Sequence, residues 1–182
     1  MILESLHNKF IGERCFILGS GPSINKQDLS LIKNEYTFCT NWFINHKDFE
    51  KLNVDFYCAY DANFTYPEIN KDWLSRLENF SNMGIFFPES WAGKFSLDNA
   101  NYVQYDNSIK VYKDNVFNFD LAKPLYDGAS VVVNMCIPIA MYMGFNKIIL
   151  LGCDTNYYSK SCLLYTSPSP RDRTRTRMPS SA

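Results

Sequence analysis

The sequence has no uninterrupted apolar run of the roughly 18 residues that a bilayer-spanning helix needs. Its first residues alternate apolar side chains with Glu4, His7 and Lys9, so they lack the continuous apolar centre of a secretory signal peptide. These two absences argue against a membrane-spanning or exported protein. We therefore expect a cytoplasmic protein without a transmembrane segment.

Patterns that bind metals or form disulfide frameworks are also missing. The chain has six cysteines but no CxxC pair, and neither of its two histidines stands at metal-ligating spacing from another ligand. Residues 1–160 contain no DxD pair that would hold a metal between two close carboxylates. Most cysteines lie within apolar stretches, so we expect them to be reduced core residues, and we expect no metal site of these kinds.

Low-complexity composition is absent from most of the chain. Apolar residues make up 46% and aromatic residues 16% of the sequence, enough for 182 residues to bury one core. The exception is residues 161–182, which hold four of the six arginines and three of the eight prolines. Without these four arginines and one aspartate the net charge changes from −1 to −4, so the rest of the chain suggests no nucleic-acid partner.

The residue order of this last stretch indicates a non-biological origin. Residues 162–172 are similar to the translation of a common transposase-type sequencing adapter, and residues 177–182 are similar to that of its flow-cell end, although Thr176 departs from the expected Ser. We therefore predict an incomplete nucleotide-binding domain over residues 1–160 and a non-native, disordered tail over residues 161–182. The alternative is a basic arm that binds nucleic acid or anionic lipid.

Predicted strands and helices alternate along residues 1–160. Compact apolar runs that stop at turn-forming residues predict strands at residues 14–18, 36–40, 54–60, 84–87, 101–105 and 148–151. Helical spacing of apolar residues predicts helices at residues 24–33, capped by Asp28, and 67–80. Residues 130–143 are apolar nearly all round and predict a buried helix that Pro138 kinks and Gly144 ends. This order predicts an α/β, Rossmann-like fold, with a mostly parallel sheet and helices on both faces.

Small and polar residues follow the ends of four predicted strands, where ligands bind in open parallel sheets. These residues are Gly19, Ser20, Gly21, Pro22, Ser23, Asn41, Asp61, Gly152 and Asp154. The glycines of the Gly-Ser-Gly-Pro-Ser turn would let a ligand approach the backbone, and its amides and hydroxyls would bind phosphate. For Asp61 and Asp154 the competing interpretation is a structural aspartate in a turn.

A second candidate site precedes the predicted buried helix, at Asp127, Gly128, Ala129 and Ser130. Free backbone amides and the Ser130 hydroxyl at a helix N-terminus suit an anion. An ordinary helix cap is the alternative interpretation.

Two familiar nucleotide-binding motifs are missing. A dinucleotide fingerprint would need a third glycine where Ile24 stands, and an acidic residue where the second strand ends in Asn41. No GxxxxGK[ST] loop occurs anywhere in the sequence. An NAD- or FAD-dependent oxidoreductase and a P-loop enzyme are therefore disfavoured, and a nucleotide would bind through another geometry.

Three segments together resemble one known family. They are GERCFILGSGPSINKQDLSLIKNE, TFCTNWF and YDGASVVVNMCIPIAMYMGFNKIILLGCD. In order and spacing they resemble the prokaryotic 6-hydroxymethylpterin diphosphokinase MptE-like family, from Gly12 to about Tyr158. The same segments are similar, more distantly, to the bacterial sialyltransferases that use CMP-sialic acid.

The resemblance to the sialyltransferases implies a nucleotide site. The matching residues are Gly19, Gly21, Pro22, Ser23, Asn41, Gly128, Ser130, Gly152 and Asp154. This chain departs from their pattern at Ser20, where they often have Asn, and after Asp154, where Thr-Asn-Tyr replaces Phe-Tyr. Their catalytic histidine would lie beyond Lys160. The catalytic residues therefore stay unknown, with Asp61 and Asp154 as candidates, and we expect this fragment to be inactive.

The resemblance implies a nucleotide-dependent transferase when the protein is full length. The leading hypothesis is a glycosyltransferase that takes a CMP-sugar donor and acts on surface glycans. The alternative enzyme is an ATP-dependent 6-hydroxymethylpterin diphosphokinase, with a pterin acceptor and Mg²⁺ held by carboxylates such as Asp61 or Asp154. A third hypothesis is a non-catalytic nucleotide-binding domain.

Overall fold

The computed structural model describes residues 3–95, 97–110, 114, 116–127 and 130–154. Six strands form one parallel sheet in the order β5-β4-β3-β2-β1-β8. They are β1 (Arg14–Leu18), β2 (Tyr36–Thr40), β3 (Phe56–Cys58), β4 (Gly84–Pro88), β5 (Ala100–Val103) and β8 (Lys147–Leu151). A small second sheet pairs β6 (Tyr105–Lys110) in parallel with β7 (Leu125–Asp127). The predicted tail and Gly128 lie outside the described residues.

Side chains that alternate along each strand enter two separate cores, one on each face of the sheet. In β1, Ile17 packs on the face that also carries Phe38 of β2, whereas Leu18 packs on the opposite face with Cys39. All four of these side chains are buried. Because both faces are covered at the centre of the sheet, β3 and β4 are buried along their whole length, as is typical of parallel sheets.

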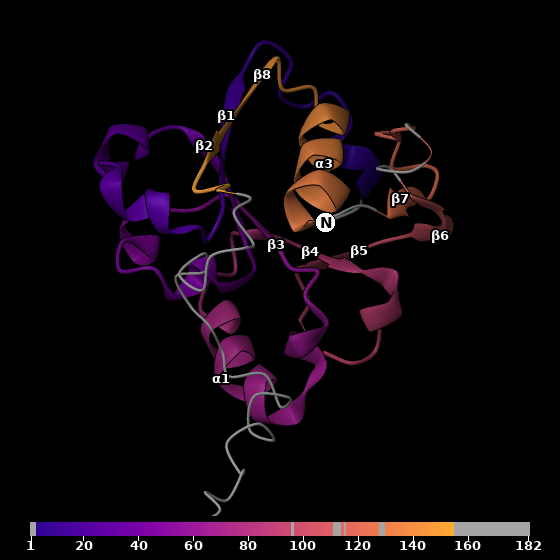
Figure 1. Cartoon of the computed structure of the whole chain (residues 1–182), viewed down its shortest axis with the longest axis horizontal. Coiled ribbons are helices and arrows are strands. Elements are labelled where there is room, and N and C mark those ends of the chain that lie inside the picture. The colour runs from indigo at the N-terminus through magenta and orange to yellow at the C-terminus, as the bar shows by residue number, and fades with distance from the viewer. Residues whose placement is uncertain (1–2, 96, 111–113, 115, 128–129, 155–182) are drawn as a thin grey trace, which may run out of the picture.

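Helices cover both faces of this sheet. On one face α1 (Pro67–Glu78) packs with short 3-10 helices, and on the other face η1 (Leu3–Leu6) packs beside a longer helix that lines the site described below. The 3-10 helices of the α1 face are η2 (Pro22–Lys26), η3 (Leu29–Ile32), η4 (Asn41–Asn45), η5 (Phe49–Lys51), η6 (Ala62–Thr65) and η7 (Glu89–Trp91). Figure 1 shows α3 (Ile137–Tyr142), the second half of that longer helix, across β1, β2 and β8 from the indigo and purple short helices. The α/β, Rossmann-like architecture predicted from the sequence is confirmed.

The helix predicted over residues 24–33 is wrong as a single element. The chain forms η2 and η3 instead, with Gln27 and Asp28 in extended conformations between them. The Asp28 carboxylate accepts a hydrogen bond from the backbone nitrogen of Ser30 at 3.1 Å. This local bond competes with a continuous helix, because it caps a new turn at Asp28. The predicted capping role of Asp28 is therefore confirmed, and the cap is the reason that the helix divides.

Two predicted strands have different bounds. The strand predicted over residues 54–60 is reduced to β3, because the Asp55 carboxylate accepts from the backbone nitrogen of Thr37 at 2.8 Å in place of a ladder bond. The strand predicted over residues 101–105 divides into β5 and β6. Gln104 stands between them, and its carbonyl accepts from the backbone nitrogen of Leu125 at 2.8 Å, so the chain leaves the large sheet there.

The helix predicted over residues 130–143 exists, but its first half is a π-helix, η8 (Val132–Cys136), which continues as α3. Pro138 stands in the first turn of α3, and it has no N–H to donate to the carbonyl of Asn134. That carbonyl accepts a hydrogen bond from the Tyr105 hydroxyl at 3.1 Å. A wide π-turn thus lies just before the proline, at the place where the sequence predicts a kink. Gly144 ends the helix with φ of +88°, as predicted.

The five cysteines among the described residues are unpaired, and Cys15, Cys39, Cys58 and Cys136 are buried in the core. Burial raises the pKa of the Cys15 thiol to about 12, so this thiol stays protonated at neutral pH. No helix in the described part of the chain is long and apolar enough to span a membrane.

Candidate functional site

The order of the strands creates a crevice beside β1. From β1 the chain adds β2, β3, β4 and β5 on one side, and it then returns to add β8 on the other side. Such a reversal leaves space beyond the carboxyl ends of the strands on either side of it. A cleft of about 420 Å³ lies there, lined by Gly19, Ser20, Gly21, Thr40, Asn41, Tyr60, Asp61, Ser130, Val131, Val132, Val133, Ile137, Leu150, Gly152, Cys153 and Asp154.

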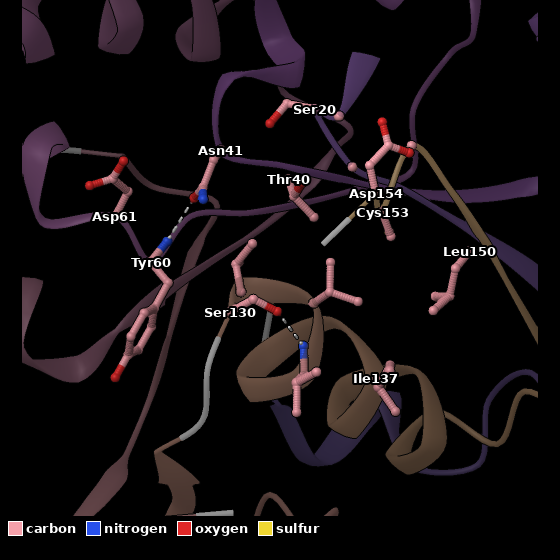
Figure 2. A pocket seen from close by; sticks show the side chains of 16 residues that line it. Ser20, Thr40, Asn41, Tyr60, Asp61, Ser130, Ile137, Leu150, Cys153 and Asp154 are labelled. Carbon is pink, nitrogen blue, oxygen red and sulfur yellow. Dashed lines mark hydrogen bonds between the residues drawn. The ribbon is translucent and has the colours of Figure 1, made fainter. Parts of the chain in front are cut away.

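The cleft has two chemically different walls, as Figure 2 shows. The strand ends contribute Ser20, Asn41 and Asp61, whereas the start of the η8–α3 helix contributes aliphatic side chains that end in Ile137. Leu150 of β8 extends the aliphatic wall, and 44% of it is exposed. The cleft therefore suits a ligand with one apolar face and one face that carries hydrogen-bonding groups.

The glycines of the two loops after β1 and β8 allow these loops to pack against each other. The Gly19 nitrogen donates to the carbonyl of Leu151, and the Gly21 nitrogen donates to that of Gly152, both at 2.8 Å. A Cβ atom on Gly19 or Gly21 would lie 2.5 or 2.6 Å from the Gly152 oxygen. The expectation that these two amides are free to bind phosphate is thus corrected, because both are already bonded to the neighbouring loop.

Asp154 joins the same two loops. Its carboxylate accepts hydrogen bonds from the backbone nitrogen of Ser23, at 2.8 Å, and from the Ser23 hydroxyl. Asp154 lines the cleft, whereas Ser23 and Pro22 do not, since Pro22 begins η2 behind it. In this structure Asp154 therefore acts as a structural aspartate that positions the β1 loop, and its role toward a ligand stays a prediction.

Asn41 marks the end of β2 and the start of η4, with a left-handed φ of +43°. Its side-chain oxygen accepts from the backbone nitrogen of Tyr60 at 3.1 Å (Figure 2). Nearby, the Thr40 hydroxyl donates to the Leu18 carbonyl at 3.1 Å, which fixes the end of β2 to the end of β1. The strand ends thus form one connected polar wall.

The charged groups of the cleft are carboxylates. Asp61 caps η6 by accepting from the backbone nitrogen of Asn63 at 3.0 Å, and Figure 2 shows it on the opposite side of the cleft from Asp154. No Lys, Arg or His is among the described residues that line the cleft. The described residues also contain no group of three or more His, Cys, Asp or Glu side chains arranged to hold a metal. An anionic ligand would therefore meet amide and hydroxyl donors rather than side-chain cations.

The helix wall is held in place by hydrogen bonds at its start. The Ser130 hydroxyl accepts from the backbone nitrogen of Val133 at 3.4 Å (Figure 2). The Tyr60 hydroxyl and the Asn134 amide both donate to the Asp127 carboxylate, at 3.3 and 3.4 Å. Burial, and then the charge of Asp127, raise the pKa of Tyr60 to about 12, so its hydroxyl remains a donor at neutral pH.

The cleft brings together most of the site residues predicted from the sequence. They are Gly19, Ser20, Gly21, Asn41, Asp61, Ser130, Gly152 and Asp154. Tyr60, Thr40, Cys153 and the aliphatic wall also line the cleft, but they were not predicted from the sequence. Tyr60 could have been found from its place just before Asp61, whereas the aliphatic residues have no local signal, because any buried helix contains them.

One comparison with known proteins relates the chain to a family. Residues 1–160 match the family model described as 6-hydroxymethylpterin diphosphokinase MptE-like. The comparison with curated proteins finds no match.

Proposed function

The chain belongs to the 6-hydroxymethylpterin diphosphokinase MptE-like family, and on this premise we propose that its cleft binds the nucleotide of a nucleotide-dependent transferase. The observation that carries the proposal is the convergence of distant segments. Ser20, Asn41 and Asp154 follow three different strands, and all three line one cleft where the strand order reverses. Nucleotides bind at this position in open α/β sheets.

The two walls of the cleft support a nucleotide as the ligand. A base and a ribose have apolar faces that would pack on Val132, Val133 and Ile137. Their phosphate would face donors on the other side, such as the Ser20 hydroxyl and the Asn41 amide nitrogen. Hydrogen-bond donors aimed at a departing phosphate stabilise the charge that develops on it, which is the main contribution that such a site makes to group transfer.

The charge of the cleft favours a CMP-sugar over ATP. A CMP-sugar carries its nucleotide charge on a single phosphodiester, whereas ATP carries a triphosphate. Asp61 and Asp154 repel either one, but they repel the triphosphate more, and no cationic side chain among the described lining residues offsets this. We therefore propose a glycosyltransferase with a CMP-sugar donor and a glycan acceptor.

The second candidate is transfer of diphosphate from ATP to a hydroxymethylpterin, and Asp61 is the observation that favours it. Its carboxylate accepts a hydrogen bond from the backbone nitrogen of Asn63 through one oxygen, whereas both oxygens of Asp154 bind Ser23. Asp61 would therefore be the residue to hold Mg²⁺, which is commonly bound by one or two carboxylates together with phosphate oxygens. Bound Mg²⁺ would neutralise charge on the triphosphate. Ser20 and Asn41 would orient the phosphates as in the first proposal.

Calorimetric titration with CMP, and with ATP in the presence and absence of Mg²⁺, tests the proposed function. We expect CMP to bind without metal, and we expect Ser20→Ala to weaken binding by about three- to tenfold, as the loss of one hydrogen bond does. Ser90→Ala, on an exposed residue outside the cleft, is the matched control. Binding that requires both ATP and Mg²⁺ would favour the diphosphokinase.

Turnover separates an enzyme from a binding domain. CMP release from CMP-sialic acid in the presence of a glycan would support the transferase. CMP binding with no product from any donor, in the protein that the source gene encodes, would support a non-catalytic nucleotide-binding domain. Failure of both CMP and ATP to bind would overturn the proposal.

A further inference from the structure

A buried chain of hydrogen bonds leads from α1 to the wall of the cleft. The indole nitrogen Nε1 of Trp73 donates to the Tyr57 hydroxyl at 2.7 Å, and this hydroxyl donates to the backbone carbonyl of Asn41 at 2.8 Å. Tyr57 is fully buried and Trp73 is 3% exposed, so the bond between these two side chains is shielded from water, whereas the bond to Asn41 is partly buried. Trp73 and Tyr57 are not among the residues that line the cleft, and Asn41 is the lining residue to which this chain of hydrogen bonds leads.

The direction of both bonds is fixed by chemistry. An indole N–H is a donor only, so the Tyr57 hydroxyl must accept from Trp73. The single hydrogen of that hydroxyl is then left for the Asn41 carbonyl, which is an acceptor only. The chain therefore holds the Asn41 peptide group by a bond whose polarity cannot reverse.

Asn41 needs such support because of its backbone conformation. Its φ of +43° lies in the left-handed region, which is sparsely populated by residues other than glycine, although Asn is among those that tolerate it best. In a residue other than glycine this conformation costs free energy, so bonds that favour it over an extended conformation help to maintain it. The Tyr57 hydroxyl fixes the carbonyl of Asn41, and the Tyr60 backbone nitrogen fixes its side-chain oxygen.

The same bonds decide which atom Asn41 offers to the cleft. The oxygen of its amide faces Tyr60, because a backbone N–H requires an acceptor. The amide nitrogen is then the group left over, and it donates to no atom among the residues that the structure describes. Asn41 therefore presents a hydrogen-bond donor to the cleft, and the ligand atom that meets it must be an acceptor, such as a phosphate or carbonyl oxygen.

We propose that Tyr57 and Trp73 are positioning residues, which hold Asn41 in its left-handed conformation so that its amide nitrogen can bind an oxygen of the ligand. The proposal rests on the proposed function in one respect, since it takes the cleft as the ligand site. The claim that Tyr57 and Trp73 hold Asn41 in its left-handed conformation concerns the free protein, so it can be tested without a ligand.

The first measurement is made on the free chain of 182 residues by NMR. Tyr57→Phe keeps the buried ring and removes the hydroxyl. We expect the coupling constant and the Cα and Cβ shifts that report φ to show Asn41 leaving the left-handed region. The control is Asn99→Ala, which removes two side-chain hydrogen bonds, to the carbonyls of Phe80 and Met83, outside the cleft. Asn41 should keep its φ in this control, because Asn99→Ala lowers stability without removing a bond to Asn41.

The second measurement is affinity for CMP and for ATP with Mg²⁺. We expect Tyr57→Phe to weaken binding by about five- to tenfold, the equivalent of roughly one neutral hydrogen bond, while Asn99→Ala stays within about twofold of the wild type. Asn41→Gly supplies a residue that adopts positive φ without support. In the Asn41→Gly background, Tyr57→Phe should weaken binding no further, because its effect acts through Asn41.

The two measurements separate the possible failures. If the wild type binds neither nucleotide, the proposed function is wrong, and the NMR result alone decides whether Tyr57 positions Asn41. An unchanged φ of Asn41 in Tyr57→Phe overturns the positioning role, and so does weakened binding that persists in the Asn41→Gly background. If Tyr57→Phe does not fold, Trp73→Phe replaces it, because it removes the donor that orients the Tyr57 hydroxyl, and the same outcomes apply.

Discussion

Gly152 combines a positive φ of +64° with close packing, and a Cβ atom there would lie 2.6 Å from the Gly19 oxygen and 2.9 Å from Cβ of Ile24. We expect Gly152→Ala to lower the free energy of unfolding by roughly 2–4 kcal/mol, through backbone strain and displacement of the β1 loop. Urea denaturation measures this. Gly93→Ala is the control, because Gly93 has φ of +75° but no atom within 4 Å of the added Cβ. Equal losses in both variants would contradict the close packing of the two loops.

His46 is a buried histidine whose protonation the fold opposes. Its Nδ1 accepts from the backbone nitrogen of Asp48 at 3.2 Å, and its Nε2 has no hydrogen-bond partner among the described residues. Burial lowers the pKa of His46 below its ordinary value of 6.5, although Asp48 partly opposes this. The unfolded chain therefore binds a proton before the folded chain does. Stability from His46 is complete above pH 6.5 and is lost as pH falls toward the lowered pKa.

The pH dependence gives a direct test of this histidine. We expect the wild type to lose more stability than His46→Asn between about pH 7.5 and about pH 5.5, because Asn can accept from Asp48 but does not titrate. Urea denaturation at both pH values measures the difference. Identical losses in the two proteins would show that other groups cause the decline.

At the scale of elements, we expect the stability of the η8–α3 helix to depend on the partner of the Asn134 carbonyl, to which Pro138 has no N–H to donate. Tyr105→Phe would leave the Asn134 carbonyl without its hydroxyl partner, and we expect a loss of about 1–2 kcal/mol in the free energy of unfolding. In the Pro138→Ala background the loss should be smaller, because alanine at this position supplies an N–H. A double-mutant cycle measured by thermal or urea unfolding decides this. Additive losses would mean that Tyr105 and Pro138 act independently.

The sequence predicts elements well where local signals decide them. The bounds of β1 and β2 match the prediction, since each is a short apolar run that ends at a turn. The helix over residues 24–33 was predicted wrongly, because one side-chain bond of Asp28 outweighs the apolar spacing. The π-turns of η8 were not predicted, because apolar spacing does not distinguish them from α-helical turns, and the Tyr105 hydroxyl that binds the Asn134 carbonyl comes from another sheet.

The candidate site follows the same rule. Strand ends are visible in the sequence, so Asn41, Asp61 and Asp154 were predicted, but their partners were not. Ser23 and Asp154 are 131 positions apart, and their contact depends on the placement of β8 beside β1. The same placement of β8 beside β1 allows the backbone nitrogens of Gly19 and Gly21 to donate to carbonyls at the end of β8 and in the loop that follows it. Tertiary pairing thus decides which of the predicted groups remain available to a ligand.

At the scale of the whole molecule, we propose that residues 161–182 are not part of the natural protein. Long-read sequencing of the source DNA across the codon for Lys160 tests this. We expect the reading frame to continue into a different sequence, with a histidine some tens of residues downstream if the protein transfers a sialyl-type sugar. A genome that encodes residues 161–182 and then stops would contradict the adapter interpretation and would favour a basic, partner-binding arm.

The position of β1 between β2 and β8 has a consequence for synthesis on the ribosome. The chain emerges from its amino end, so β1 to β5 can pair before β8 is made. Until the segment up to Asp154 has emerged, Gly19 and Gly21 have no loop to pack against and β1 has one open edge. The cleft is therefore completed only after β8 and the loop that follows it have emerged, and a nascent chain that stalls before this point carries five of the six strands without the finished cleft.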